Sequence, residues 1–384
     1  MSGKTVIVLG GGIGGVVVAS RLRKQLRREH RVILVEREVN HLFQPSLLWL
    51  MTGARTAEAI QRPVARLARR GIELVHGEIE AIDPKLRSVR VAGREIQGDY
   101  LVVALGAEYA PETIPGLAEA GHNFYTLAGA QSLRDARANL RHGHLVVLVS
   151  GIPFKCPAAP YESAMLLEAD LRSRGVRDHV TVDVYTPEPG PMLTAGPEVS
   201  AQLRQMVTSK NIQLHTEHAV VKVDPAARLL HFANGATAGF DLLAYIPPHR
   251  APAVVRASGL TGESGWVPVD RNTLETKFPG VYAIGDVTGI PLAIGKPLPK
   301  AGVFAHAEAE VVAHNIACAI RGAGTPHGYD GHGECFVEIG DGRAGVGSGN
   351  FYAEPAPRVR LRPPSRLLHL GKVLYEKYWL YRWF

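Results

Sequence analysis

Residues 5–15 read TVIVLGGGIGG and residues 31–36 read RVILVE, and these two stretches decide the fold. The β-branched apolar run Thr5–Leu9 predicts a buried parallel strand. A helical pattern follows over Val16–Arg28, and Arg31–Val35 predicts a second strand that ends at Glu36. Strand, glycine loop, helix, strand and acidic residue in this order indicate a βαβ unit that binds a dinucleotide.

Each glycine of the GxGxxG pattern has its own physical role. Gly10 permits a tight turn, Gly12 lets the backbone approach a pyrophosphate, and Gly15 lets the helix pack closely on the strand. The N-terminus of the helix presents free N–H groups and the positive end of its dipole to the phosphates. Glu36 can accept hydrogen bonds from ribose hydroxyls. The sequence therefore predicts a nucleotide-binding Rossmann unit at the start of the chain.

A second α/β segment begins near residue 145. Leu145–Ser150 and Val180–Tyr185 predict strands, and Ser163–Arg174 between them predicts a helix. The loop Gly151–Glu162 reads GIPFKCPAAPYE. We expect Leu242–Ile246 to be a strand that returns the chain to the first domain.

The rest of the chain contributes shorter signals. A basic helix is expected around Ala57–Arg70, and a strand over Phe278–Asp286 ends in Gly285 and Asp286. The loop Gly295–Gly302 leads into a predicted long helix, Val303–Arg321. Near the end of the chain, the sequence predicts short strands at Glu334–Ile339 and Arg343–Val346. An aromatic-rich, amphipathic segment follows at Ser365–Phe384.

Composition and charge exclude several classes of protein. The 384 residues are 46% hydrophobic and contain no apolar run of membrane-spanning length, so no transmembrane helix is expected. The opening residues Met1–Lys4 lead straight into a strand, and no secretory signal is expected. The net charge of +7 suits a basic soluble enzyme, an anionic lipid surface or an anionic substrate. Because there is no nucleic-acid motif or dense block of Lys and Arg, no nucleic-acid partner is expected.

The cysteines and histidines predict no metal site. The three cysteines, Cys156, Cys318 and Cys335, form no CxxC pair and no disulfide framework. Cys318 lies in a helical pattern, where a buried core cysteine is expected. His41 and His306 are the histidines nearest the expected chemistry, and each is interpreted as a hydrogen-bonded structural residue.

With GxGxxG at the start and YAIGD near the end, at residues 282–286, the sequence resembles the glutathione-reductase-like flavoproteins with two dinucleotide-binding domains. The resemblance covers nearly the whole chain and implies an α/β fold with two Rossmann-like domains. It implies an FAD-binding domain at 1–110 and 241–328, and a second domain at 111–240 that carries the cysteine loop. The remaining region, 329–384, is expected to contact membrane and quinone.

Within that superfamily, enzymes that use pyridine nucleotides carry a second glycine motif where this chain has Gly151–Pro157 (GIPFKCP). Its prolines remove N–H donors and stiffen the turn, which makes it a poor cradle for NADH. The segment Cys156–Glu162 is similar to that of sulfide:quinone oxidoreductases and of the flavoprotein subunit of flavocytochrome c sulfide dehydrogenases. Cys335 in GHGECFVE and the loop Pro297–Gly302 (PLPKAG) also match this family.

The resemblance implies that hydrosulfide attacks a Cys156–Cys335 disulfide, and that the freed Cys335 thiolate reduces the flavin before quinone takes the electrons. Lys155 and Lys300 are expected to lower the thiol pKa, and Lys300 to stabilise the reduced flavin. Glu162 is a candidate base, with a helix N-terminal carboxylate as the alternative. The residues expected to hold FAD are Gly10, Gly12, Ile13, Gly14, Gly15, Glu36, Arg37, Gln44, Ala104, Gly106, Gly285, Asp286, Lys300 and Ala301.

The departures from the family pattern bear on partners. No cysteine precedes Cys156, so FAD is expected to be non-covalent, and a cytochrome-linked sulfide dehydrogenase subunit is the less favoured function. The segment Phe124–Leu133 lacks the third cysteine of some relatives, which bears on release of polysulfur. The same fold would also suit a type II NADH:quinone oxidoreductase or a flavoprotein that serves only as an electron-transfer module. A quinone substrate implies a peripheral position on the cytoplasmic membrane, contacted by Ser365–Phe384, unless this segment docks on the enzyme or on a second copy.

Overall fold

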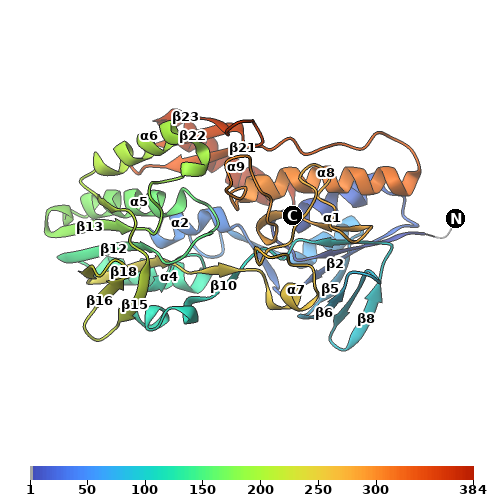
Figure 1. Ribbon diagram of the computed structural model, residues 1–384, viewed down its shortest axis with the longest axis horizontal. Helices are drawn as coiled ribbons and strands as arrows, with labels where there is room; N and C mark the ends of the chain where they lie inside the picture. Colours follow the sequence, from blue (N-terminus) through green and yellow to red (C-terminus); the bar gives the residue numbers. More distant parts are fainter. Residues whose placement is uncertain (1–2) are drawn as a thin grey trace.

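The computed structural model describes residues 3–384, and its frame is a pair of parallel five-stranded sheets (Figure 1). The first sheet has the order β20–β9–β1–β2–β5, and every neighbouring pair in it is parallel. Its strands are β1 (Thr5–Leu9), β2 (Arg31–Glu36), β5 (Glu73–His76), β9 (Tyr100–Val103) and β20 (Val281–Ala283). The predicted βαβ unit at the start of the chain is therefore confirmed.

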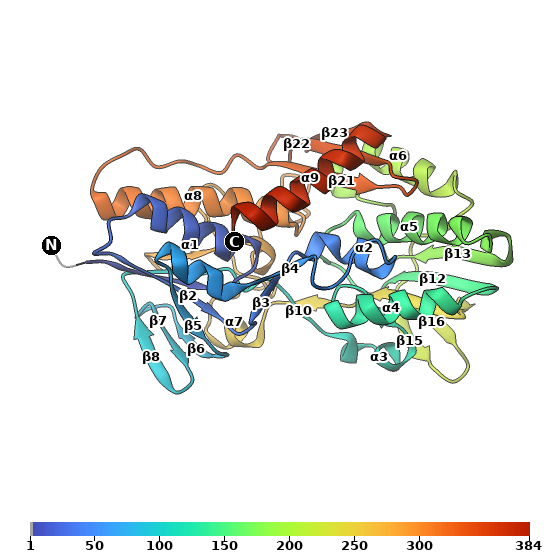
Figure 2. The same ribbon diagram turned by 180° about the vertical axis from the view of Figure 1, so that it is seen from behind.

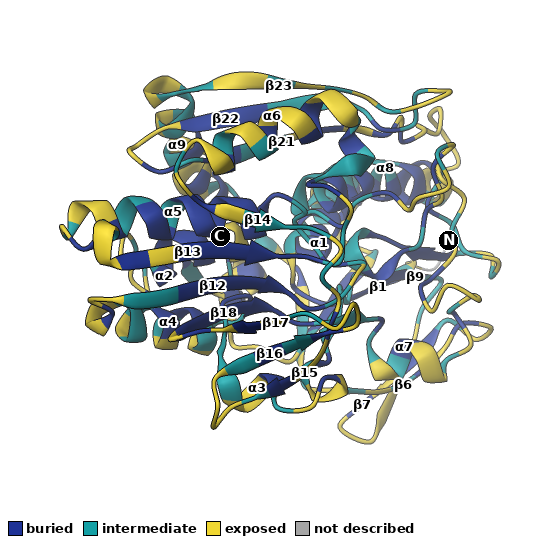
Figure 3. Cartoon of the chain, turned by 60° about the vertical axis from the view of Figure 1, so that its left-hand side comes forward, coloured by how far each residue is buried: buried dark blue, intermediate teal, exposed yellow. Residues whose placement is uncertain are grey.

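The second sheet has the order β11–β18–β12–β13–β14 and is also parallel throughout. Its strands are β11 (His122–Asn123), β12 (Gly143–Val149), β13 (Val180–Tyr185), β14 (Gln213–His215) and β18 (Leu242–Ile246). Figure 3 shows β12, β13 and β18 as buried strands in the middle of this layer. The two sheets confirm the predicted α/β fold with two Rossmann-like units.

The structure corrects the predicted return strand. Leu242–Ile246 does not return to the first domain, because it pairs with β12 from Leu145 to Val149. A fully buried apolar strand fits either sheet equally well, so the sequence pattern did not distinguish them. The chain crosses between the sheets instead through β19 (His249–Arg250), which pairs antiparallel with β10 (Glu108–Tyr109). The boundary predicted at residue 241 therefore lies too early.

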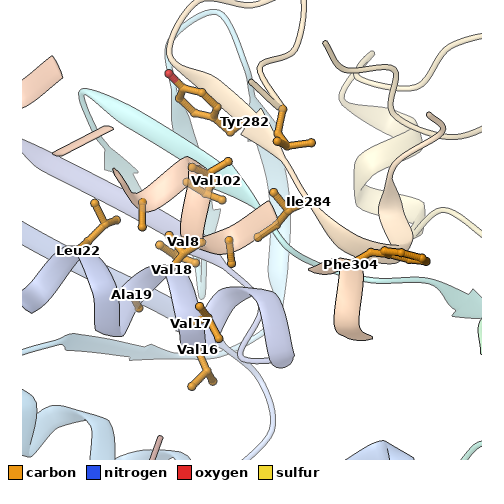
Figure 4. Packing of buried hydrophobic residues seen from close by; sticks show 14 of the residues in the cluster. Val8, Val16, Val17, Val18, Ala19, Leu22, Val102, Tyr282, Ile284 and Phe304 are labelled. Atoms are coloured by element: carbon orange, nitrogen blue, oxygen red, sulfur yellow. The ribbon is translucent and has the colours of Figure 1, made fainter. Parts of the chain in front are cut away.

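Helices cover the sheets and the small antiparallel sheets extend them. Helix α1 (Ile13–Gln25) packs along α8 (Gly302–Arg321) on the first sheet, and Figure 4 shows Val17 and Leu22 of α1 near Val8 of β1. The other helices are α2 (Leu47–Met51), α3 (Leu117–Ala120), α4 (Leu127–Asn139), α5 (Ala159–Ser173), α6 (Pro197–Thr208) and α7 (Ala253–Ala257). The additional strands are β3 (Asn40–Leu42), β4 (Gln61–Pro63), β6 (Ile79–Asp83), β7 (Ser88–Val91), β8 (Arg94–Gln97), β15 (Val220–Asp224), β16 (Leu229–Phe232) and β17 (Thr237–Gly239).

Two helix predictions need correction. Helix α5 begins at Ala159, four residues before the predicted start, because Pro160 is compatible with the first turn of a helix. The cysteine loop is correspondingly shorter. The predicted basic helix at Ala57–Arg70 is instead strand β4 followed by the 3₁₀ helix η2 (Val64–Arg70). The other 3₁₀ turns are η1 (Gln44–Ser46), η3 (Pro111–Thr113), η4 (Arg177–His179), η5 (Leu193–Ala195) and η6 (Gly285–Val287).

The C-terminal region forms an antiparallel sheet of β21 (His332–Glu338), β22 (Ala344–Asn350) and β23 (Arg358–Ser365). Strand β21 contacts both α5 of the second domain and α8 of the first, so this sheet lies against both halves of the molecule. Strand β23 was not predicted, because its sequence RVRLRPPS combines arginines with two prolines. Such a pattern suits an edge strand with an exposed face.

The last helix of the chain is α9 (Arg366–Arg382), and it buries charged side chains while an apolar face is exposed to solvent. Its Ser365 N-cap side chain accepts a hydrogen bond from the Leu368 backbone N–H. Polar side chains at positions 372 and 376 and the apolar Trp379 and Leu380 face the protein and are buried. The outward face is apolar and 50–85% exposed, and it consists of Leu367, Leu370, Leu374, Tyr378 and Tyr381.

Candidate functional site

The glycine loop after β1 has the geometry that its sequence predicts. Gly10 has φ +95°, and a Cβ there would lie 2.6 Å from the Ala104 carbonyl oxygen. A Cβ on Gly15 would lie 1.8 Å from the Gly10 oxygen, so the helix approaches the strand too closely for any side chain. Packing within the protein thus requires glycine at both positions.

Gly12 and Gly106 differ from these, because a Cβ at either position would meet no atom within 4 Å. In the turn η6 after β20, the Asp286 Oδ1 atom is buried and has no hydrogen-bond partner in the structure. Buried polar atoms without a partner are rare and call for a ligand or water. Open space at these glycines and an unsatisfied carboxylate oxygen fit the pyrophosphate and ribityl groups of a flavin dinucleotide.

The acidic residue at the end of β2 is turned toward the glycine loop. The Glu36 carboxylate accepts hydrogen bonds from the Gly11 backbone N–H and, at 2.7 Å, from the Glu38 backbone N–H. Arg37 is different, because its guanidinium is 62% exposed and lies 3.1 Å from the Glu78 carboxylate. The structure therefore brings Glu36, but not Arg37, to the expected cofactor loop.

The N-terminus of α8 meets the N-terminus of α1 on the other side of the loop. A Cβ on Gly302, next to Ala301, would lie 2.5 Å from the Ile13 Cδ1 atom, and one on Gly14 would lie 2.9 Å from Ile284. Two positive helix ends therefore converge on one place, which favours an anionic group there.

Glu308 was not predicted as a site residue, yet its carboxylate holds the Gly285–Asp286 turn by a hydrogen bond to the backbone. Its carboxylate accepts a hydrogen bond of 2.6 Å from the Gly285 backbone N–H. Burial raises the pKa of Glu308 to about 7. A glutamate within a mostly apolar helix is the sequence signal that indicates such a residue, although Glu310 two positions on gives the same signal.

Lys300 is buried and ties two loops together. Its Nζ atom donates hydrogen bonds of 2.8 Å to the carbonyl oxygens of Asp286 and Thr288. The ammonium also lies 3.4 Å from the centre of the Trp266 ring, and burial lowers the pKa of Lys300 to about 8. These contacts explain how the loop Pro297–Gly302 is held against the turn at Asp286.

The cysteine loop is fastened to the same Lys300 loop. The Cys156 backbone N–H donates to the Lys300 carbonyl oxygen at 2.6 Å, and residues 155 and 300 form a parallel bridge. The Tyr125 hydroxyl donates to the Lys155 carbonyl oxygen at 2.7 Å. The Lys155 ammonium donates to the Gln44 side chain at 2.6 Å. Gln44, Lys155 and Lys300 therefore belong to one contiguous cluster of loops.

Cys156 and Cys335, which lie far apart in the sequence, line one apolar cavity. Cys156 has φ +54°, a left-handed backbone that non-glycine residues rarely adopt and that is frequent at functional sites. Cys335 projects from β21, where it pairs with Gly347 of β22. All three cysteines are free thiols in the structure. Ala301 and Phe304 of the α8 start also line this cavity, which connects it to the cofactor loops.

A buried cluster of charges lies beside the cysteines. Glu162 accepts hydrogen bonds from the Glu338 backbone N–H at 2.8 Å and from the Lys372 Nζ atom at 3.1 Å. The Lys372 ammonium is 3.9 Å from the Glu338 carboxylate, which in turn lies 3.0 Å from the His369 Nδ1 atom. These four side chains, which we call the charge cluster, come from α5, β21 and α9.

The charge cluster acts on both thiols. Burial and the Glu162 carboxylate raise the pKa of Cys335 to about 11, and burial raises the pKa of Cys156 well above its usual range. Lys372 lowers the pKa of each thiol. Lys155 and Lys300 were expected to lower these pKa values. Burial opposes the charge of Lys155, but the negative charges around it, that of the Cys156 thiolate among them, raise its pKa, so the Lys155 ammonium in turn favours the Cys156 thiolate. The role of Lys300 stays a prediction. Burial outweighs the cations, and the net shift of both thiol pKa values is upward.

Lys372, Glu338 and His369 were not predicted as site residues. A signal existed in α9, because polar residues recur at helical spacing opposite the leucines of the exposed face. The expected structural residues behave as predicted. Cys318 is buried in α8, and the His41 Nδ1 atom is 2.8 Å from the Gly11 carbonyl oxygen while burial lowers the pKa of His41 to about 4.

Two absences concern the part of the chain that the structure describes, residues 3–384. No helix there combines the length and apolar character needed to cross a membrane. No group of three or more histidine, cysteine, aspartate or glutamate side chains there is arranged to hold a metal ion.

Comparison with known proteins gives consistent similarities. Residues 4–309 match the family model described as pyridine nucleotide-disulphide oxidoreductase. The sulfide-quinone reductase of Aquifex aeolicus (strain VF5) is 28% identical over 99% of this chain and 91% of its own length. An X-ray structure of the sulfide:quinone oxidoreductase from Aquifex aeolicus covers 99% of this chain and 91% of its own, with a TM-score of 0.89 and 26% identity. The alternative NAD(P)H-ubiquinone oxidoreductase C1 of Arabidopsis thaliana is 26% identical over 82% of this chain and 67% of its own length.

Proposed function

The chain belongs to the pyridine nucleotide-disulphide oxidoreductase family, and on that basis we propose that it is an FAD-dependent sulfide:quinone oxidoreductase. One observation carries the proposal: Cys156 and Cys335 line a single cavity beside the loops that fit a flavin dinucleotide. Proteins of this family typically bind FAD. The similarity in sequence and in structure to the sulfide:quinone oxidoreductase of Aquifex aeolicus supports the same substrates.

FAD, when bound, would take up the two electrons released when the thiolate and the persulfide re-form the disulfide and oxidised sulfur leaves, and it would pass them to a quinone. The open space at Gly12 and the unpaired Asp286 oxygen are the places that would hold its pyrophosphate and ribityl chain. Ala104, Gly106, Gly285 and Ala301 would line the same loops. The nearest cysteine in sequence to the glycine loop is Cys156, which is assigned to catalysis, so the cofactor is proposed to be non-covalent.

The chemistry assigned to this chain is thiol–disulfide exchange. Hydrosulfide forms a bond to one sulfur of an oxidised Cys156–Cys335 pair while the S–S bond breaks, which leaves a persulfide on one cysteine and a thiolate on the other. Lys372 stabilises the negative charge that develops there, because it lowers the pKa of both thiols. The high thiol pKa values favour return of a proton to the sulfurs once they are reduced. Glu162 is in hydrogen-bond contact with Lys372 and modulates that balance.

The main competing function is that of a type II NADH:quinone oxidoreductase. It is supported by the similarity to one relative that is named for NAD(P)H and ubiquinone. Against it stands the loop after β12. In place of glycines it carries Pro153, Cys156 and Pro157, and Cys156 is tied to the Lys300 loop by its backbone. A loop built this way has few N–H groups to offer to a second pyrophosphate.

Access to a quinone is proposed to come through α9. Figure 2 shows α9 running from the C-terminal sheet toward α1. Its outward face is a stripe of leucines and tyrosines that are at least half exposed. Exposed apolar stripes of this kind, with tyrosine and neighbouring basic residues, suit the boundary between lipid headgroups and acyl chains. The inward face is secured by the Arg55–Glu376 ion pair at 2.9 Å, so the apolar face stays directed outward. We therefore propose a peripheral position on the cytoplasmic membrane.

Rapid mixing of the anaerobic yellow protein with sulfide, and separately with NADH, tests the proposal. Sulfide alone is expected to bleach the flavin absorbance rapidly, and added quinone is expected to restore it. Bleaching by NADH alone would refute the proposal and would return Cys156 to a structural role. A haem protein that copurifies and takes the electrons in place of quinone would favour a cytochrome-linked sulfide dehydrogenase.

Replacing Gly12 by alanine is expected to weaken FAD binding without disturbing the fold. The new methyl group meets no protein atom within 4 Å, so it costs little in the apoprotein. It would occupy the space assigned to the pyrophosphate, and we expect FAD affinity to fall at least about tenfold, which corresponds to roughly 1.4 kcal/mol. Flavin fluorescence on dilution measures the affinity and circular dichroism checks the fold. Unchanged FAD affinity would show that the pyrophosphate lies elsewhere.

A further inference from the structure

A second hollow, away from the cysteines and the cofactor loops, is lined almost entirely by cations. It has a volume of about 190 Å³ and lies between α1, η2 and the C-terminal end of α9. Its lining residues are Ser20, Arg21, Arg23, Lys24, Arg70, Arg382 and Trp383. We call this the basic hollow. Five positively charged side chains and no carboxylate surround it.

The charges of the basic hollow are poorly compensated. Arg21 pairs with Glu310 at 2.6 Å, but among residues 3–384 no carboxylate lies within ion-pair distance of Lys24, Arg70 or Arg382. Arg70 and Arg382 are held side by side, because the Arg70 Nη2 atom donates to the Arg382 carbonyl oxygen at 3.1 Å. Packing like charges together without an anion costs free energy, which a bound anion would offset.

One polar side chain of the hollow also lacks a hydrogen-bond partner. The Ser20 hydroxyl is buried and has no hydrogen-bond partner in the structure. A phosphate oxygen is a strong acceptor that satisfies a hydroxyl and several guanidinium or ammonium groups together. The burial of Arg70 and its proximity to Arg382 lower the pKa of its guanidinium, which is the direction expected for a cation that lacks a counter-ion.

The position of the hollow indicates the source of the phosphate. Arg382 and Trp383 follow directly on the outward apolar face of α9, whose last member is Tyr381. Figure 2 shows the C-terminal end of α9 beside α1, and the Arg21 guanidinium lies 5.3 Å from the Trp383 ring. A phosphate at headgroup depth would therefore meet the hollow when the apolar face enters the acyl boundary.

We propose that the basic hollow binds the phosphodiester headgroup of an anionic phospholipid and so fixes how α9 lies on the membrane. The inference rests on the membrane association in the proposed function and adds a specific lipid partner to it. The hydroxyl of Ser20 and the cations Lys24, Arg70 and Arg382 hold the phosphate. The leucine and tyrosine stripe of α9 supplies the apolar part of the contact.

Flotation of the FAD-loaded protein with vesicles tests the proposal. One set of vesicles contains phosphatidylcholine alone and the other also contains phosphatidylglycerol. In the triple variant Lys24→Gln, Arg70→Gln, Arg382→Gln, binding to the anionic vesicles is expected to fall at least about tenfold, because each such cation contributes roughly fivefold. Binding to the neutral vesicles is expected to stay the same.

The matched control removes three exposed cations that follow α1 or lie on η2 but do not line the hollow, in the variant Arg27→Gln, Arg28→Gln, Arg66→Gln. A loss in the control equal to that in the hollow variant would mean diffuse charge attraction and would overturn the site. Lys24→Glu, at an exposed position, repeats the test with one surface change if the triple variant folds poorly. Specific binding of inorganic phosphate in solution, with vesicle binding of the triple variant unchanged, would assign the hollow to a soluble anion and also overturn the proposal.

The outcome is separable from the proposed enzymatic function. Sulfide-dependent bleaching of the flavin is measured in solution and does not involve vesicles. A wild-type protein that bleaches with sulfide but prefers neither kind of vesicle would refute the lipid site alone. Failure of sulfide to bleach the flavin would refute the reaction and leave the lipid measurement to stand by itself.

Discussion

Cys156→Ser is expected to abolish reduction of the flavin by sulfide, with a fall in rate of at least about 10³-fold, the scale seen when a catalytic nucleophile is removed. The serine hydroxyl cannot form the disulfide that hydrosulfide attacks. Cys156 and Cys335 line the same cavity, so Cys335→Ser is expected to have an effect of the same order. Anaerobic stopped-flow absorbance of each variant measures the rate.

Cys318→Ser is the matched control, because Cys318 is buried in α8 and does not line that cavity. It is expected to keep the wild-type rate. All three variants are expected to keep bound FAD, which distinguishes lost chemistry from a lost cofactor. Full-rate bleaching of Cys335→Ser by sulfide would remove the cysteine pair from the mechanism.

Lys372→Met is expected to destabilise the protein by about 3–5 kcal/mol, which is typical when one partner of a buried ion pair is removed. Methionine roughly preserves the length of the side chain but removes the cation that pairs with the buried Glu162 carboxylate, while Glu338 keeps only its contact with His369. Denaturant unfolding measures the loss. Lys377→Met is the control on the same helix, since Lys377 is exposed, and a change within about 0.5 kcal/mol is expected there.

A second measurement separates an electrostatic role of Lys372 from a structural one. Lys372 lowers the pKa of both thiols and Glu162 raises it. In the reduced protein, Lys372→Met is therefore expected to move thiol alkylation to higher pH, whereas Glu162→Gln is expected to move it to lower pH. A purely structural role would loosen the site in both variants and shift alkylation in the same direction, and that result would contradict the assignment.

Much of the fold follows from local sequence patterns. The β-branched runs at Thr5–Leu9 and Val180–Tyr185 and the glycines at positions 10, 12 and 15 act over a few neighbouring residues, so they predict strands and turns directly. The assignment of Leu242–Ile246 failed for the opposite reason. Which sheet a buried strand joins depends on pairing with distant residues, here β12, and an apolar pattern carries no information about that choice.

The site residues likewise fall into those that lie in local sequence motifs and those that meet only through tertiary packing. Gly12, Glu36 and Asp286 belong to local motifs, and the Glu36 carboxylate accepts a hydrogen bond from the Gly11 backbone N–H of the glycine loop. The charge cluster could not be predicted, because Glu162, Glu338 and Lys372 come from three distant segments and meet only through tertiary packing. Cys335 was found through the family resemblance, since nothing in its own surroundings in the sequence distinguishes it from an ordinary strand cysteine.

The location of β21 has a consequence for how chains of this kind are classified. The family model ends at residue 309, whereas Cys335 and Lys372 lie beyond it. The matched part is a general framework for nucleotide chemistry that relatives with different electron donors share. The last part of the chain brings one of the two sulfurs, the cation that acts on both sulfurs, and the outward apolar helix. A relative should therefore be assigned to sulfur or to nicotinamide chemistry by its C-terminal sheet and helix as well as by the loop after β12, because the C-terminal features lie outside the residues that the family model matches.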